Sequence, residues 1–113
     1  MHRIFGIPFS TVYPLYLTKV EKKGRSRDEL DQVIRWLTGF SQTDLRKQLA
    51  NESSLTEFFD AASIHPNAPL ITGVICGVRI EELEDPLMKK IRYMDKLVDE
   101  LAKGRPLEKI LRK

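Results

Sequence analysis

The sequence predicts a mainly α-helical protein, a single-domain bundle of about six helices over residues 1–113. Three observations predict this fold class. Two Ser-x-x-Glu sequences, beginning at Ser26 and Ser54, are capping boxes, which satisfy unpaired backbone donors at the beginning of a helix. Glycines follow several apolar stretches, where a left-handed residue commonly ends a helix. The composition, 42% hydrophobic and 31% charged, is typical of a globular domain with one core.

Four helices are expected in the first half of the chain, over 10–24, 26–39, 41–49 and 54–62. Each of them begins at a serine that can cap it, and glycines end the first two. In the first helix, apolar residues recur at helical spacing and are expected to face the core. These residues are Val12, Leu15, Tyr16 and Val20. The proline-rich segment after the fourth helix is expected to be a loop.

The segment from Asp85 to Lys103 is the clearest helix in the chain. Asp85 can cap it, Pro86 occupies the first helical position without losing a hydrogen bond, and Gly104 ends it. Its apolar residues form a heptad seam over about two heptads. They are Leu87, Ile91, Met94, Val98 and Leu101. The seam suits packing within one chain, and the alternative is a two-fold contact in a homodimer. A last short helix is expected over 106–113.

The segment 70–80 can be read in two ways. Its β-branched residues and two glycines favour a strand, which would give an α+β fold with a short central strand at 70–80. On a helical wheel, however, the apolar residues fill one continuous arc, and Gly73 and Gly77 form a flat strip that a second helix could approach closely. We therefore predict a buried central helix. Cys76, which has apolar neighbours, is then expected to be a small buried thiol.

Features of the whole chain limit its location. No run of about 18 uncharged apolar residues occurs, so no membrane segment is expected. The N-terminus lacks the apolar run of a signal peptide. Cys76 is the only cysteine, so no internal disulfide can form, which agrees with a reducing compartment. The sequence thus predicts a cytoplasmic protein that does not act at a membrane.

Few residues are suited to catalysis or to metal binding. A zinc site needs three or four ligands at suitable spacing, and the chain offers only His2, His65 and Cys76, which lie far apart. The HExxH, GxGxxG and Walker sequences are absent. We therefore expect no metal and no cofactor. The sequence leaves enzymatic activity open but favours a non-catalytic protein.

Two basic segments are candidates for contact with nucleic acid, and the chain carries a formal charge of +3. The first is the basic N-terminal region, and the second is the helical hairpin 27–50, which resembles a helix-turn-helix. Their candidate residues are Lys22, Lys23, Arg25 and Arg27 in the first, and Gln42, Arg46 and Lys47 in the second. The alternative is structural, because cations near a helix end also compensate its dipole.

A third set of candidates lies around the polar side of the long helix. It comprises Arg79, Arg92, Tyr93 and Asp95. If these side chains converged, they could form a small-ligand site or an active site, because charged groups with perturbed pKa values gather at such sites. The alternative is a solvated helix face, on which oppositely charged residues three or four positions apart form ion pairs.

Long stretches of the chain resemble a known bacterial family. The stretches are VYPLY, KVEKKGRS, IRWLTGFSQ, LITGVICGVRIEELEDPLM and IRYMDKLVDELAKGRPLEKILRK. Together they are similar to the family named domain of unknown function 2200. The resemblance implies a bacterial cytosolic protein and supplies no reaction, cofactor or catalytic residue. From the residues themselves we predict a non-catalytic helical interaction module that could form a homodimer, with a nucleic-acid-binding protein and a small-ligand protein or enzyme as alternatives.

Overall fold

A computed structural model of the chain describes residues 3–112, which are mainly α-helical, as the sequence predicted. The α-helices are α1 (Phe9–Glu21), α2 (Arg27–Thr38), α3 (Gln42–Ala50), α4 (Leu55–Ala61), α5 (Pro86–Ala102) and α6 (Leu107–Ile110). Three 3-10 helices, η1 (Arg3–Gly6), η2 (Ala68–Leu70) and η3 (Ile80–Glu82), and the strands β1 (Val74–Ile75) and β2 (Val78–Arg79) complete the described part. The prediction of about six helices is therefore confirmed.

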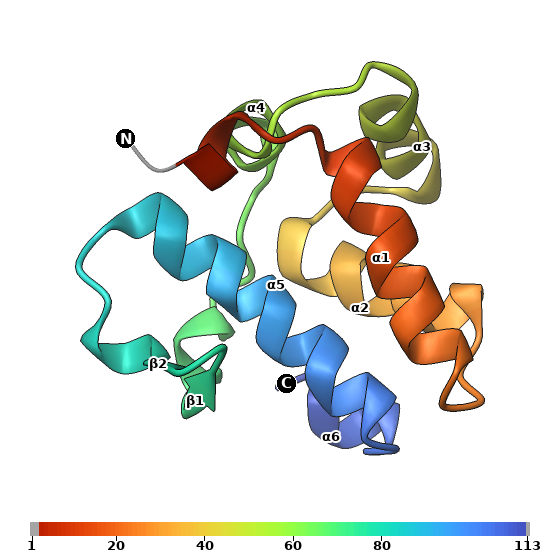
Figure 1. Ribbon diagram of the computed structural model, residues 1–113, viewed down its shortest axis with the longest axis vertical. Coiled ribbons are helices and arrows are strands. Elements are labelled where there is room, and N and C mark those ends of the chain that lie inside the picture. Colours follow the sequence, from red (N-terminus) through yellow and green to blue (C-terminus); the bar gives the residue numbers. More distant parts are fainter. Residues whose placement is uncertain (1–2, 113) are drawn as a thin grey trace.

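Helix α5 crosses the middle of the molecule, with α1 and α2 on one side and the hairpin β1–β2 on the other (Figure 1). It contacts α1, α2, α4, α6 and β1. Four residues of the predicted heptad seam, Ile91, Met94, Val98 and Leu101, are buried in the core, and Leu87 is half-buried. The seam thus packs within one chain. A dimer contact through it would require the core to open.

The core-facing side of helix α1 was predicted in part, because Val20 is buried and Val12 and Tyr16 are partly buried against the core. Its buried residues are Phe9, Tyr13 and Val20, whereas Leu15, which was expected to be buried, is 68% exposed. The helix begins at Phe9, one residue before the serine that was taken as its cap. The ring of Phe9 stacks on that of Phe58, with 4.1 Å between the centroids. This aromatic contact fixes the rotation of α1 about its axis.

Helix α2 begins and ends where the sequence predicted, because a capping contact is formed at each end. The Ser26 hydroxyl accepts from the backbone N–H of Glu29 at 3.2 Å, and the backbone N–H of Ser26 donates to the Glu29 carboxylate at 3.0 Å. Such a reciprocal pair satisfies two donors that the helix leaves unpaired. At the other end, Gly39 has a left-handed φ of 75° and its N–H donates to the Arg35 carbonyl. The expected capping box at Ser54 is also formed.

We expect Gly39→Ala to lower the free energy of unfolding by about 1–2 kcal/mol. A Cβ atom there would lie 3.0 Å from the carbonyl oxygen of Ser63, and the positive φ disfavours any L side chain. Denaturant unfolding followed by circular dichroism measures the loss. Gly24→Ala is the matched control, because Gly24 has a similar φ of 81° but nothing within 4 Å of its Cβ position. Equal losses in the two variants would show that the contact with Ser63 does not matter.

The helix predicted over 70–80 is wrong, because η2 ends at Leu70 and the residues after it form the antiparallel hairpin β1–β2. Gly73 and Gly77, taken as a packing strip, have φ values of 102° and 75°, which an α-helix does not allow. Cys76 precedes Gly77 and also has a positive φ, 53°. Two successive positive φ values form the two-residue hairpin turn that matches the twist of the strands. The alternative reading is confirmed as to strand structure within 70–80. It is wrong as to a central position, since the two short strands form a hairpin beside the helices (Figure 1).

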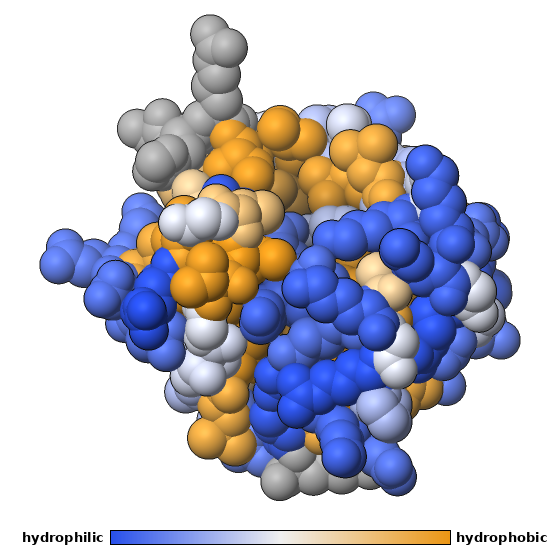
Figure 2. All heavy atoms as spheres, turned by 60° about the horizontal axis from the view of Figure 1, so that its bottom comes forward, coloured by the Kyte–Doolittle hydropathy of each residue, from blue (hydrophilic) through white to orange (hydrophobic). Residues whose placement is uncertain are grey.

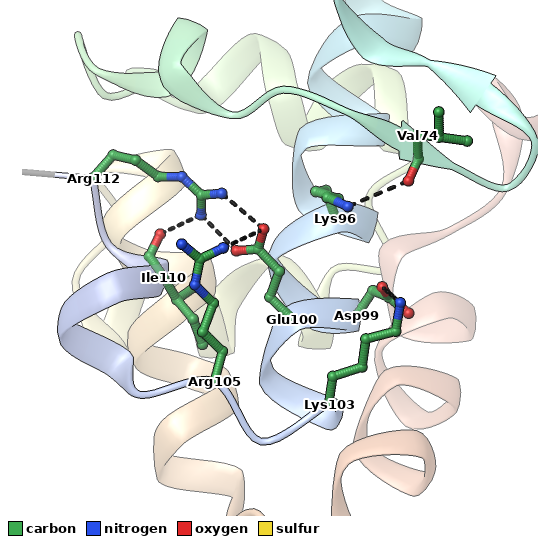
Figure 3. Close-up of polar contacts among 8 residues, drawn as sticks. All are labelled: Val74, Lys96, Asp99, Glu100, Lys103, Arg105, Ile110 and Arg112. Carbon is green, nitrogen blue, oxygen red and sulfur yellow. Dashed lines mark hydrogen bonds and ion pairs between the residues drawn. The ribbon is translucent and has the colours of Figure 1, made fainter.

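The hairpin is attached to the side of α5. The Lys96 ammonium donates to the Val74 carbonyl oxygen at 3.3 Å (Figure 3). Leu70 and Val74 remain 57% and 52% exposed. Figure 2 shows hydrophobic side chains at the left and across the top of a largely hydrophilic surface, and Figure 1 places the hairpin on the left. Cys76 is exposed, so the prediction of a buried thiol is also wrong.

A buried carboxylate fastens the C-terminal segment to α5 (Figure 3). Glu100 is only 7% exposed and forms a two-pronged ion pair with Arg112, at 2.6 and 2.7 Å. Arg105 adds a third contact to the same carboxylate at 3.1 Å. One nitrogen of Arg112 also donates to the carbonyl oxygen of Ile110 at 2.6 Å. The end of the described chain is therefore held in one position.

Candidate functional site

Two of the seven residues predicted to contact nucleic acid have internal partners. The Arg25 guanidinium donates to the Glu29 carboxylate at 2.7 and 3.0 Å and to the carbonyl oxygen of Arg105 at 3.0 Å. These contacts hold the α1–α2 turn against the C-terminal segment. The Gln42 amide donates to the Asp31 carboxylate at 2.9 Å, between α3 and α2. Both side chains therefore have a structural role.

The other five predicted residues are exposed cations without an ion pair to any residue in the range 3–112. They are Lys22, Lys23, Arg27, Arg46 and Lys47, and we call them the free cations. The first two lie in the α1–α2 turn, Arg27 begins α2, and the last two lie on α3. Since all five side chains are exposed and form no ion pair within the described residues, they can contact a partner.

A hollow of about 360 Å³ between α1, α2 and α3 brings several predicted residues together. It is lined by Tyr13, Arg27, Asp28, Asp31, Gln42, Arg46 and Leu49, and we call it the α2–α3 groove. Arg27 reaches it from α2 and Arg46 from α3, so two free cations from the two predicted basic segments meet there. The structure thereby links segments that the sequence could only treat separately.

A buried hydrogen-bond network lies in the α2–α3 groove. The Tyr13 hydroxyl donates to one oxygen of Asp31 at 2.5 Å, and Gln42 donates to the other oxygen. Asp31 is only 5% exposed, so both carboxylate oxygens need these partners. Burial raises the pKa of Tyr13 above its usual value of 10.0, the hydrogen bond to Asp31 and the charge of Asp31 raise it further, and Arg27 opposes the shift.

Sequence reasoning missed Tyr13 and Asp31. The available signal was a carboxylate next to the buried stripe of α2, since Asp31 directly follows Leu30. A charged residue at such a position is rarely buried unless it has partners. The partner Tyr13 is 18 positions away on another helix, so the pair could not be read from local spacing.

Two members of the predicted polar cluster form a contact. Arg92 and Asp95 form an ion pair at 2.8 Å on α5, as their spacing of three residues suggested. The hydroxyl of Tyr16 on α1 donates to the same carboxylate. Burial raises the pKa of Tyr16 well above 10.0, and the charge and hydrogen bond of Asp95 add to the shift. This contact joins α1 to α5.

The other two members of the cluster lie apart from this contact. Arg79, in the hairpin, is exposed and its ion pair is with Glu82, at 4.0 Å. Tyr93 is buried, and burial raises the pKa of its hydroxyl. The structure thus connects Arg92 and Asp95 with Tyr16, a residue that the sequence prediction did not include. A ligand role for the four predicted residues stays a prediction.

Among residues 3–112, no three His, Cys, Asp or Glu side chains converge as ligands for a metal ion. His2 lies outside the described residues. None of the helices in this range combines the length and the apolar character needed to cross a membrane. The residues that the structure does bring together are suited to binding through charge and hydrogen bonds.

Comparison with known proteins agrees with this structure. Residues 3–112 match the family model described as "Uncharacterized protein conserved in bacteria (DUF2200)". The chain belongs to this family. The resemblance predicted from the sequence is therefore confirmed. The DUF2200 protein is also similar to a solved structure, "Crystal structure of uncharacterized protein SP1917", with 42% identity and a TM-score of 0.92, over 98% of this chain and 93% of that chain.

No curated protein matches the DUF2200 protein. The family description and the neighbouring structure both carry the word uncharacterized, so neither supplies an activity. Any functional conclusion for this DUF2200 member must come from its own surface, and above all from the free cations and the α2–α3 groove.

Proposed function

We propose that this protein is a non-catalytic interaction module and that its partner is a nucleic acid. The observation that carries the proposal is the set of five free cations. In α5 and the C-terminal segment, ion pairs within the described chain engage Arg92, Lys103, Arg105 and Arg112 but not Lys89, Lys90 or Lys109. By contrast, the free cations cluster in sequence at the α1–α2 turn and α3. Unpaired Lys and Arg bind phosphates with release of condensed counterions.

The geometry of the hairpin α2–α3 supports the same partner. Three residues join the helices, Gly39 in a left-handed conformation, Phe40 buried in the core, and Ser41 capping α3. Helix α3 packs against both α1 and α2, so the angle of the hairpin is fixed. In helix-turn-helix proteins the second helix enters the major groove and its first residues contact bases. Here the exposed residues of α3 include Thr43, Arg46 and Lys47.

The proposal places the protein in the cytoplasm, where bacterial nucleic acid lies. It leaves a homodimer possible only through a surface other than the buried seam of α5. Helix-turn-helix dimers bind two half-sites about one helical turn of DNA apart. The size of the bound complex therefore shows whether the protein binds as a homodimer. One protein per site and no measurable self-association would remove the homodimer from the proposal.

Binding of duplex DNA and of an RNA hairpin at several salt concentrations tests the proposal. If all five free cations contact phosphates, the slope of log K against log salt is expected to be about −4.5. The variant Arg46→Gln/Lys47→Gln should bind more weakly, and the magnitude of its slope of log K against log salt should be smaller by about 2. Lys109→Gln is the matched control, because Lys109 is an exposed lysine on α6. No binding at low salt, or equal weakening in the control, would contradict the proposal.

A further inference from the structure

Helix α3 lies at the edge of the molecule, where a partner can reach it (Figure 1). On a helical wheel, the side of α3 opposite the buried Leu45 carries exposed residues, none of which is acidic. They are Thr43, Arg46, Lys47 and Ala50, and we call this side the outer face of α3. Asp44 lies beside this face and lines a separate hollow with Gly39 and Ser63. The outer face therefore presents two of the free cations and no carboxylate.

Contacts on its buried side fix the orientation of α3. Gln42, the first residue of the helix, donates to the Asp31 carboxylate of α2 at 2.9 Å. The hydroxyl of Tyr13 on α1 donates to the other oxygen of that carboxylate. A binding element that is already held in place loses little conformational entropy when its partner binds. Helix α3 can thus enter a partner as a preformed element.

The burial of the aromatic residues argues against a single-stranded partner. Proteins that bind single strands stack the bases on exposed aromatic side chains. Within residues 3–112, no Phe, Tyr or Trp side chain is exposed. The two that are half-buried have partners already, since Trp36 stacks on His65 and the Tyr16 hydroxyl donates to Asp95. A single strand would meet cations on this part of the chain but no aromatic surface for its bases.

The shape of the groove separates duplex DNA from duplex RNA. The major groove of B-form DNA is about 12 Å wide and admits an α-helix. The major groove of A-form RNA is deep and narrow, and side chains cannot read it. Helix α3 has nine residues and is therefore about 14 Å long, a length that suits one crossing of the DNA groove. An exposed helix of this kind fits DNA better than RNA.

We propose that the partner is duplex DNA and that the outer face of α3 lies in its major groove, with Thr43 against the base edges and Arg46 and Lys47 on phosphates. This inference rests on the proposed function and narrows its partner to one class. Thr43 is the second residue of α3, and the first residues of a recognition helix contact bases. Its hydroxyl can donate or accept, and its methyl group can contact that of thymine. Phosphate contacts carry no sequence information, so Thr43 determines the base preference.

Three nucleic acids of matched sequence test the partner class at one ionic strength: a DNA duplex, the corresponding RNA duplex and one separate DNA strand. We expect the DNA duplex to bind about tenfold more tightly than the other two, or better. Methylation of guanine N7, in the major groove, should interfere with binding, whereas methylation of adenine N3, in the minor groove, should not. Equal or tighter binding of RNA or of the single strand, or interference from the minor groove alone, would overturn this inference and leave the proposed function standing. No binding to any of the three would overturn both.

Selection from randomised DNA duplexes tests the role of Thr43. Thr43→Val keeps the shape of the side chain and removes the hydroxyl, so it should relax the preference at one base pair and leave the slope of log K against log salt unchanged. Thr11→Val is the matched control, because Thr11 is also exposed and lies in the first turn of α1. Circular dichroism confirms that both variants are folded. No base preference in the unmodified protein, or an unchanged preference in folded Thr43→Val, would overturn the base contact, and the three-way comparison above uses the unmodified protein alone.

Discussion

Replacing Glu100 with alanine is expected to lower the free energy of unfolding by about 3 kcal/mol. The carboxylate lies between Arg112 and Arg105, and Arg112 is itself mostly buried, with 13% of its side chain exposed. Removing the carboxylate leaves the Arg112 guanidinium without its partner in a region of low dielectric. It also frees the segment after α6, including Leu111. Urea denaturation of the two proteins measures the difference.

Two further variants separate the charge effect from general loss of contacts. Glu108→Ala is the surface control, because Glu108 is an exposed residue of α6, and its cost should stay within about 0.5 kcal/mol. The double variant Glu100→Met/Arg112→Met replaces the pair with apolar side chains of similar length and should recover most of the lost stability. The interpretation fails if Glu100→Ala is no more destabilising than Glu108→Ala.

Elements whose ends are determined by neighbouring residues could be predicted from the sequence. Ser26 and Glu29 are three positions apart, and the capping contacts they form involve only the first turn of α2. The same holds for Asp85, whose carboxylate accepts from the backbone N–H of Met88 at 3.0 Å at the beginning of α5. Such contacts form in any tertiary setting, so the pattern alone is sufficient.

The hairpin could not be predicted with the same certainty, because its decisive feature is backbone geometry at an unusual residue. The usual signal for its turn is Asn-Gly or Asp-Gly, whereas this chain has Cys76 before Gly77. A non-glycine residue at φ 53° is uncommon, so propensity gave no reason to expect it. The continuous apolar arc on the helical wheel then favoured a helix over 70–80. The contacts that hold the hairpin on α5 are long-range, among them the hydrogen bond from the Lys96 ammonium to the Val74 carbonyl oxygen, so local sequence does not encode them.

The candidate sites were predictable only as lists of residues. The basic character of Arg27 and Arg46 was visible, but their meeting in one groove depends on the way α3 packs on α1 and α2. The contact of the C-terminal segment with α2 was not predicted at all. Leu111 lies beside Arg35, a residue more than 70 positions earlier, and Glu100 positions that segment. Long-range pairing of this kind leaves no periodic trace in the sequence.

The three tyrosines of the chain are expected to keep their protons above pH 10.0 in the folded protein, because the pKa of each is raised. Burial is the first cause at each, and a carboxylate adds to it at two of them, Asp31 for Tyr13 and Asp95 for Tyr16. The folded protein therefore holds these protons more tightly than the unfolded chain does. This contribution to stability is fully present below pH 10.0 and is lost as the pH rises through the folded-state pKa values.

Ultraviolet titration of the phenolate signal measures this effect. In urea the tyrosines should ionise near pH 10.0, whereas in buffer the signal should stay low above that pH and then rise together with the loss of helix seen by circular dichroism. Tyr13→Phe should lower the total signal by about one third, because it removes one of three tyrosines. A tyrosine that ionises near pH 10.0 while the helices remain intact would contradict the burial of that hydroxyl. Coincident transitions would show that proton loss at these buried groups and unfolding of the bundle are one event.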